Sequence, residues 1–174
     1  MTGAAELVEA LTRTIPDFPR PGIEFKDLTP VLADRDALAS VADALVAPFA
    51  GDYDVIAGIE ARGFAFAAAA AARAGSGLVL IRKGGKLPGE THGEDYDLEY
   101  GTDRLEVHAG QVPPGTRVLV VDDVLATGGT LAAAQALVDR AGWRIAGFSV
   151  VLELGFLGGR ARLAPRVPYA IVRR

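Results

Sequence analysis

Cysteine is absent from this sequence of 174 residues, and histidine occurs only twice. The absence of cysteine excludes a disulfide framework, a thiolate metal site and a cysteine nucleophile. With only His92 and His108, a metal site built from several histidines is disfavoured as well. No run of about 18 apolar residues occurs, so we expect no membrane-spanning helix and no membrane partner. The first ten residues lack the pattern of a signal peptide, and we expect a cytoplasmic protein.

Basic charge is not in excess either. The chain has 18 Lys and Arg against 22 Asp and Glu, a net charge of −4, and we therefore expect no nucleic-acid partner. Half of the residues are hydrophobic and 23% are charged, which is typical of a globular protein. The length fits one domain, residues 1–174, with a core large enough to fold without disulfides or a structural metal. Glycine, in contrast, is abundant: 21 residues, above the usual share of about 7%.

Strand and helix patterns alternate through most of the chain. The unbroken apolar run from Val118 to Val121 is typical of a parallel strand that is covered on both faces. Asp34 is the expected N-cap of a helix. We predict a helix after Asp34, further helices over 5–15, 64–74 and 129–141, and strands over 54–59, 77–81, 117–121, 145–152 and 169–172. This alternation predicts an α/β fold with a mainly parallel central sheet flanked by helices.

Two segments do not follow the alternation. Prolines exclude a regular helix across residues 16–30. Residues 83–101 are polar and contain glycine without a helical stripe, and we expect a mobile loop there, since long loops in compact domains are often functional. Residues 90–103 contain six acids and no Lys or Arg, so self-repulsion should keep this loop open.

The strongest motif follows the apolar run at 118–121. Two carboxylates, Asp122 and Asp123, precede a turn of small residues that opens the next predicted helix. Glycines let backbone N–H groups approach a phosphate, and the helix N-terminus adds positive partial charge. Two adjacent carboxylates suit the hydroxyls of a ribose whose 5-phosphate lies in the turn. The turn residues are Ala126, Thr127, Gly128, Gly129 and Thr130.

Other nucleotide-binding motifs are missing from the sequence. It has no G-x-x-x-x-G-K-[ST] motif, and no G-x-G-x-x-G motif opens a helix after a strand. An ATP-type P-loop is thus excluded and a dinucleotide fold is disfavoured. The alternative interpretation of the acidic pair is a strand end that caps a helix beside an ordinary glycine turn.

The acidic pair with its turn resembles the signature of the phosphoribosyltransferases that use phosphoribosyl pyrophosphate. Further segments, in family order between about residues 16 and 165, narrow the resemblance to the adenine phosphoribosyltransferase family of type I phosphoribosyltransferases. These segments are 19–27, 60–64, 81–89, 98–101, 152–154 and 159–160. Glu24 departs from the family pattern, where an aliphatic residue is expected.

The resemblance implies a fold and a reaction. A hood from about residues 1–33 would sit over the C-terminal edge of the sheet, and residues 83–101 would form a mobile loop. The reaction would convert adenine and phosphoribosyl pyrophosphate into AMP and pyrophosphate, in purine salvage. Mg²⁺ would be held mainly through the substrate, without direct protein ligands. The protein would be a homodimer in which Arg82 and Lys83 complete the neighbouring site.

The resemblance also assigns roles to residues. It implies that Arg62 follows a cis peptide bond between Glu60 and Ala61, and that Glu99 governs a proton of adenine. The implied catalytic residues are Glu99, Tyr100 and Arg62. Phosphoribosyl pyrophosphate would bind to Asp122, Asp123 and the turn 126–130, with its pyrophosphate on Arg62, Arg82, Lys83 and Lys86. Adenine would bind to Glu24, Phe25, Lys26 and Leu154.

Several of these residues also have plain interpretations. Arg62 could pair with a surface carboxylate, the cations at 82–86 could form a solvated turn, and Phe25 could anchor the core. Two other functions stay open: transfer to another base, such as xanthine or orotate, and a regulator that binds phosphoribosyl pyrophosphate without turnover. Residues 155–174 contain five arginines and no acid, a basic patch that neither function explains.

Overall fold

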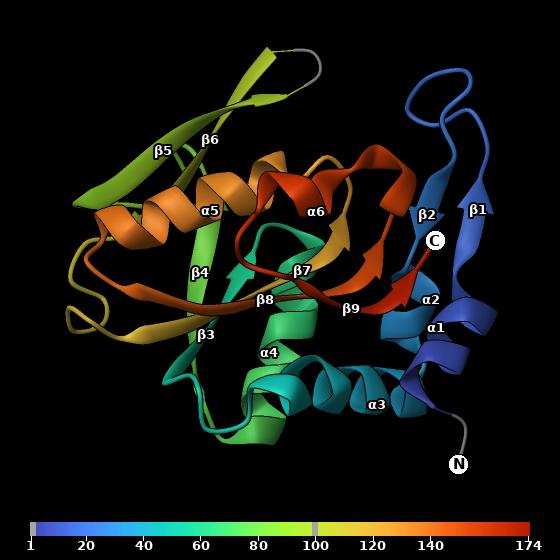
Figure 1. Ribbon diagram of the computed structural model, residues 1–174, viewed down its shortest axis with the longest axis horizontal. Coiled ribbons are helices and arrows are strands. Elements are labelled where there is room, and N and C mark those ends of the chain that lie inside the picture. Colours follow the sequence, from blue (N-terminus) through green and yellow to red (C-terminus); the bar gives the residue numbers. More distant parts are fainter. Residues whose placement is uncertain (1–2, 99–100) are drawn as a thin grey trace.

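A mixed sheet of seven strands forms the centre of the molecule in the computed structural model, which describes residues 3–98 and 101–174 (Figure 1). The strand order is β5-β6-β4-β3-β7-β8-β9. Their bounds are β3 Val55–Ile59, β4 Gly77–Lys83, β5 Thr91–Leu98, β6 Gly101–His108, β7 Arg117–Leu125, β8 Arg144–Glu153 and β9 Tyr169–Arg173. The strands β4, β3, β7, β8 and β9 are parallel, whereas the hairpin β5–β6 adds antiparallel strands beside β4. The predicted α/β fold is confirmed.

Helices cover both faces of this sheet. Along β7, Val118 and Val120 belong to a core that α5 covers, while Leu119 and Val121 point into the opposite core. This alternation is why the strand reads as a continuous apolar run. The helices are α1 Ala4–Leu11, α2 Thr29–Ala33, α3 Arg35–Val46, α4 Arg62–Ala74, α5 Gly129–Arg140 and α6 Gly159–Arg162, with short 3₁₀ turns at Ala47–Phe49 and Gly155–Leu157.

Local chemistry explains where two of these helices lie. Asp34 caps α3, because its side chain accepts hydrogen bonds from the N–H groups of Asp36 and Ala37, as predicted. The alanine-rich α4 packs closely on β3. A Cβ atom added to Gly58 would lie 2.6 Å from the Cβ of Ala67, so this approach needs a glycine on the strand.

The predicted helix over residues 5–15 is wrong in its second half. Helix α1 ends at Leu11, and strand β1, Arg13–Ile15, follows it and pairs with β2, Phe25–Asp27. The Thr12 side chain donates to the Val8 carbonyl at the end of the helix. Ile15, which the helical pattern counted as apolar helix surface, is 40% exposed on this two-stranded sheet. Helix α1 contacts β9, so the N-terminal segment lies against the C-terminal edge of the main sheet.

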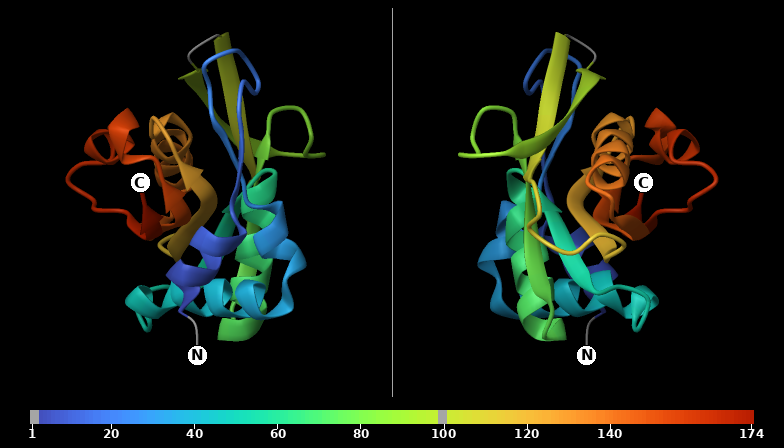
Figure 2. Two further views of the ribbon diagram at one scale, coloured as in Figure 1. Left: turned by 90° about the vertical axis from the view of Figure 1, so that its right-hand side faces the viewer. Right: turned by 90° about the vertical axis from the view of Figure 1, so that its left-hand side faces the viewer.

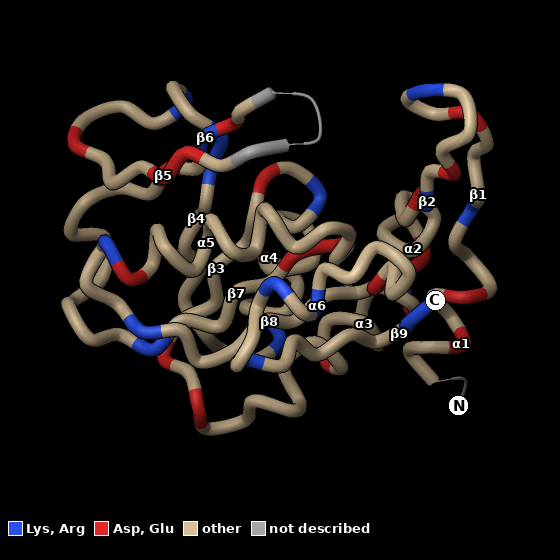
Figure 3. Tube along the Cα trace, turned by 45° about the horizontal axis from the view of Figure 1, so that its top comes forward, with Lys and Arg blue, Asp and Glu red and all other residues tan. Residues whose placement is uncertain are grey.

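The predicted loop over residues 83–101 is right for residues 84–90, which form turns and bends, and wrong beyond them, since β5 occupies Thr91–Leu98 and pairs along its length with β6. The acids of this segment do not repel one another freely, because three of them meet cations: Glu94 pairs with Arg140 at 2.6 Å, Asp95 with Arg104 at 2.8 Å and Asp103 with Lys83 at 2.9 Å. Figure 3 shows acidic and basic segments together along this hairpin and β4. A polar strand of this kind lacks the apolar period that identifies strands in a sequence.

The segment from β1 to β2 and the hairpin β5–β6 project toward the same end of the molecule, as both views in Figure 2 show. Because β3, β4 and β7 are parallel, their carboxyl ends also meet at one edge of the sheet. Ligands of open α/β sheets bind beyond this edge. Among the described residues, no helix has the length and apolar character needed to cross a membrane.

Candidate active site

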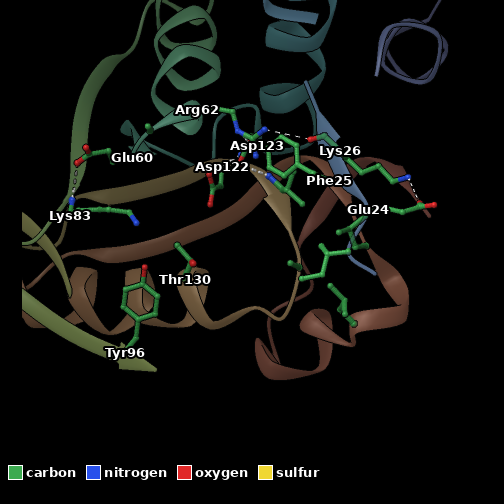
Figure 4. A pocket seen from close by; sticks show the side chains of 16 residues that line it. Glu24, Phe25, Lys26, Glu60, Arg62, Lys83, Tyr96, Asp122, Asp123 and Thr130 are labelled. Atoms are coloured by element: carbon green, nitrogen blue, oxygen red, sulfur yellow. Dashed lines mark hydrogen bonds and ion pairs between the residues drawn. The ribbon is translucent and has the colours of Figure 1, made fainter. Parts of the chain in front are cut away.

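A cavity of about 580 Å³ lies beyond the carboxyl ends of β3, β4 and β7, with the hood strand β2 on one side and β5 on the other (Figure 4). Its lining brings together segments that are up to about 130 residues apart in the sequence, from Ile23 to Leu157. The lining residues are Ile23, Glu24, Phe25, Lys26, Glu60, Ala61, Arg62, Lys83, Tyr96, Asp122, Asp123, Val124, Ala126, Thr130, Leu154 and Leu157.

The acidic pair forms the floor of the cavity. Strand β7 continues through both residues, and each is only 8% exposed. Asp122 Oδ1 accepts the N–H of Asp123, and Asp123 Oδ1 accepts the N–H of Val124, each at 2.8 Å. Burial and the neighbouring charge of Asp123 raise the pKa of Asp122 well above its usual range. Hydroxyl donors or a cation at this pair would therefore stabilise its charged form.

Gly63 makes room for the pair. A Cβ atom at this position would lie 2.7 Å from Asp122 Oδ1 and 3.2 Å from the Val121 carbonyl oxygen. The glycine after Arg62 thus lets α4 begin directly against the acidic strand. The peptide bond between Glu60 and Ala61, just before this helix, is cis, as the resemblance implied.

Arg62 links the acidic floor to the hood. Its Nε lies 2.6 Å from Asp123 Oδ2, a buried oxygen that has no aligned hydrogen-bond donor among the described residues. Its Cζ lies 4.8 Å from the centre of the Phe25 ring, and Nη1 donates to the Lys26 carbonyl at 3.5 Å. In this structure the guanidinium therefore pairs with a carboxylate, but that carboxylate belongs to the cavity and not to the outer surface.

The glycine turn after β7 surrounds a recess of about 60 Å³ at the start of α5. Gly128 has a φ of 80°, which favours glycine, and a Cβ there would lie 2.5 Å from the Gly159 carbonyl oxygen. The first residues of α6 thus lie directly against the turn. Thr127, Gly128 and Gly129 line this recess, whereas Ala126 and Thr130 line both the recess and the larger cavity.

The three predicted cations at the end of β4 do not all reach the cavity. Among the described residues, Lys83 lines the cavity and Arg82 and Lys86 do not. Arg82 and Lys86 both pair with Glu60, which also accepts the backbone N–H of Lys83 at 2.9 Å. These contacts lower the pKa of Glu60, although burial alone would raise it. Glu60 was not among the predicted site residues, and its signal in the sequence was its place directly before the Ala61-Arg62 turn.

The four residues expected at the base all line the cavity. Glu24 pairs with Lys26 at 2.9 Å, so this departure from the family pattern is accommodated by an ion pair on the hood. Phe18 packs edge-on against Phe25, with the ring centres 5.1 Å apart. Two apolar residues that the sequence analysis did not select, Ile23 and Leu157, complete this wall. Glu99 and Tyr100, the two expected loop residues, lie outside the described residues.

The basic C-terminal segment has an acidic partner that lies just before it. Glu153, the last residue of β8, is 1% exposed, and its carboxylate accepts two bonds from Arg160 Nε at 3.0 and 3.2 Å and a further one from Nη2. Arg173 Nε lies 3.4 Å from the same carboxylate. Two of the five arginines thus balance a buried charge beside the wall residue Leu154.

Known proteins resemble this chain over nearly its whole length. Residues 25–168 match the family described as phosphoribosyl transferase domain. An adenine phosphoribosyltransferase from Clavibacter sepedonicus is 58% identical over 171 residues, which are 98% of this chain and 89% of the relative. Two solved structures are similar as well. Adenine phosphoribosyltransferase from Rhodothermus marinus has 45% identity, a TM-score of 0.91 and 98% of both chains covered. Adenine phosphoribosyltransferase from Saccharomyces cerevisiae, solved with adenine and an imino-altritol bisphosphate, has 36% identity, a TM-score of 0.88 and 96% of both chains covered.

Proposed function

The chain belongs to the phosphoribosyl transferase family, and from this premise we infer that it is the enzyme that joins adenine to the phosphoribosyl group of phosphoribosyl pyrophosphate. The products are AMP and pyrophosphate, a purine-salvage reaction. One observation supports this function most: the acidic pair and an apolar wall with Phe25 line one cavity, and the phosphate-sized recess of the glycine turn adjoins it at Ala126 and Thr130. Conversion of radiolabelled adenine by the purified protein tests it, and the same assay with hypoxanthine, xanthine and orotate tests the choice of base.

The substrate halves fit different parts of the cavity. Backbone N–H groups at the start of α5 and the hydroxyls of Thr127 and Thr130 would hold the 5-phosphate. The carboxylates of Asp122 and Asp123 would accept hydrogen bonds from the ribose hydroxyls. Lys83 and Arg62 would face the pyrophosphate, and Arg62 would leave its ion pair with Asp123 to do so. In our proposal Arg82 and Lys86 act through Glu60 or reach a neighbouring subunit.

Adenine would lie between the hood and the segment after β8. Phe25 and Leu154 offer apolar surface, and backbone groups of Glu24 and Lys26 are available to the polar edge of the base. The relative from Saccharomyces cerevisiae was solved with adenine and a bisphosphate, which supports a site for both halves in one cavity. Arg62 contacts both the Phe25 ring and Asp123, so it stands where base and ribose would be joined.

We propose Mg²⁺ as the cofactor, held mainly through the oxygens of the substrate and water and without direct protein ligands. Asp122 and Asp123 would act on it indirectly, because they accept hydrogen bonds from the ribose hydroxyls, and Oδ2 of Asp123 already lies 2.6 Å from Arg62 Nε. When bound, the ion would neutralise charge on the leaving pyrophosphate. We also place the reaction in the cytoplasm, because substrate and product carry phosphate charges that do not cross a bilayer unaided.

In the reaction, N9 of adenine bonds to C1 of the ribose as the bond from C1 to pyrophosphate breaks, and the proton of the imidazole ring leaves, from N7 in the tautomer that frees N9 to attack. We assign control of this proton to Glu99, with Tyr100 beside it, on the strength of the sequence resemblance. The predicted mobility of residues 83–101 stays a prediction. Closure of this segment over the cavity would exclude water and limit hydrolysis of the substrate.

The Thr130 side chain should act mainly in binding, since the 5-phosphate is present before and during the reaction. We expect Thr130→Ala to raise the KM for phosphoribosyl pyrophosphate about tenfold or more, and to lower kcat less. Steady-state kinetics measures both constants. Thr116→Ala, in a turn where the hydroxyl donates only to the Pro113 carbonyl, is the matched control. An unchanged KM in folded Thr130→Ala protein would exclude phosphate binding by this side chain.

We propose a homodimer that uses the outer surface of β4 and α4. Leu80 is 37% exposed on β4, and it pairs with Gly58, above which the backbone of Phe64 lies. Arg82 follows Leu80 on the same face of the strand, which would direct it toward the partner. We expect sedimentation velocity to show a dimer, and Leu80→Glu to shift it to a monomer with reduced activity.

Val167→Glu is the control for the dimer prediction, because Val167 is 75% exposed between α6 and β9, away from this surface. It should leave the sedimentation coefficient unchanged. A fully active monomer at working concentration would contradict the proposed role of the partner.

A further inference from the structure

A row of polar side chains crosses three strands and ends at the phosphate turn. Lys83 on β4 pairs with Asp103 on β6, with 2.9 Å between Nζ and Oδ2. The Tyr96 hydroxyl on β5 donates to the same Oδ2 at 3.3 Å. Thr130, at the start of α5, lies beside the Tyr96 hydroxyl. The row therefore connects the two places where phosphate groups of the substrate would bind.

Strand register explains why these side chains share one face. Tyr96 and Asp103 are directly opposite in the hairpin, and Lys83 pairs with Leu105, two residues beyond Asp103. Side chains that are opposite or two residues apart point to the same face of a sheet. Lys83, Tyr96 and Thr130 all line the cavity, and Figure 4 shows the Lys83 amine and the Tyr96 hydroxyl directed toward it.

The protonation states of the three side chains in this row follow from their contacts. Hydrogen bonds from Lys83 and from the Arg104 N–H lower the pKa of Asp103 despite its burial, and Asp103 in turn raises the pKa of Lys83. Burial and the Asp103 charge raise the pKa of Tyr96. At neutral pH an ionised carboxylate thus accepts hydrogen bonds from an ammonium group and a protonated hydroxyl. Both donors face the cavity.

We propose that Asp103 occupies these two donors in the substrate-free enzyme, and that the phosphate groups of the substrate take its place. Tyr96 is then a further binding residue, whose hydroxyl donates to the 5-phosphate held by the 126–130 turn. Asp103 is a positioning residue: it keeps Tyr96 and Lys83 directed at the cavity and competes with pyrophosphate for Lys83. This inference rests on the proposed function and adds two residues that the sequence analysis did not select.

Ribose 5-phosphate and inorganic pyrophosphate, used as separate probes, distinguish the two halves of the row. We expect Tyr96→Phe to weaken ribose 5-phosphate binding about tenfold in calorimetry, because one hydrogen bond to a charged group is lost. Pyrophosphate binding should stay within about twofold of the wild type. The variant keeps the aromatic ring and its packing, so folding is preserved. Wild-type affinity for ribose 5-phosphate in Tyr96→Phe would overturn the role of Tyr96.

Asp103→Asn should change affinity in the opposite direction. Removing the competing charge is expected to tighten pyrophosphate binding about threefold to tenfold. Asp95→Asn is the matched control, because Asp95 pairs with Arg104 on the other face of the same hairpin and is 71% exposed. Equal or weaker pyrophosphate binding in Asp103→Asn would overturn the competition. A wild-type protein that binds both probes but forms no AMP would refute the proposed function and leave the binding test of the row intact.

Discussion

Replacing Glu99 by glutamine is expected to lower kcat by about 10²–10⁴-fold, with the KM for phosphoribosyl pyrophosphate nearly unchanged. As adenine becomes a nucleoside base, N9 forms the new bond and must lose its proton, or the proton must be arranged on N7. A carboxylate near N7 stabilises the right tautomer and the developing charge, most strongly when water is excluded. Glutamine keeps the size and some hydrogen bonding but removes the charge.

The KM for phosphoribosyl pyrophosphate should stay unchanged, because other residues bind this substrate. The acidic pair and the 126–130 turn are on β7 and α5, whereas Glu99 belongs to the segment between β5 and β6. Steady-state and single-turnover kinetics measure kcat and the chemical step separately.

The control for Glu99 must be a nearby acid whose side chain makes no ion pair or hydrogen bond with the part of the chain that the structure describes. Glu94 is unsuitable, because it pairs with Arg140 on α5 at 2.6 Å and is 23% exposed. Glu90 is exposed at the start of the hairpin, and Glu90→Gln should change kcat by less than about threefold. Equal losses in both variants would mean that the total charge of the segment matters. Full activity of Glu99→Gln would show that our catalytic assignment is wrong.

The second large effect concerns stability. Glu153→Ala is expected to lower the free energy of unfolding by about 3 kcal/mol, because it leaves Arg160 without its partner in a mostly buried site. For a chain of this size that corresponds to a fall in Tm of roughly 6–12 °C. Urea denaturation and thermal melting measure the change. Asp43→Asn is the matched control: Asp43 also accepts two bonds from an arginine, Arg73, but is 54% exposed, so it should cost at most about 1 kcal/mol.

The difference in the free energy of unfolding between the wild type and Glu153→Ala should depend on pH. Hydrogen bonds from Arg160 hold the pKa of Glu153 below its ordinary value. A carboxyl whose pKa is lowered on folding stabilises the protein fully above its unfolded pKa, about 4.3, and loses this contribution as the pH falls through its folded pKa. The gap between wild type and Glu153→Ala should therefore be constant near pH 7 and shrink at acidic pH. A gap that widens toward acidic pH would contradict the ion-pair explanation.

This ion pair also bears on the active site. Arg160 follows Gly159, whose carbonyl lies against Gly128 of the phosphate turn, and Glu153 precedes the wall residue Leu154. In Glu153→Ala, the KM for both substrates should accordingly rise along with the loss of stability.

The sequence by itself determined the parts of this protein that depend on neighbouring residues. The apolar runs identified β3, β7 and β8, Asp34 marked the start of α3, and the acidic pair with its glycine turn pointed to the phosphate recess. Each of these features follows from period, capping or turn chemistry within about a dozen residues. The match of several such segments in one order was enough to indicate the family.

Only the tertiary structure decided which distant side chains meet. β5 is polar, and its identity as a strand depends on pairing with β6 and packing against α5, which no local pattern encodes. The pairing of Glu60 with Lys86, and of Glu153 with Arg160, depends on elements that come together when the sheet forms. The placement of Tyr96 beside Thr130 has the same origin, 34 positions apart in sequence. Contacts of this kind arise from strand order and register. Order and register are in turn set by the whole core, because all strands must bury their apolar faces at the same time.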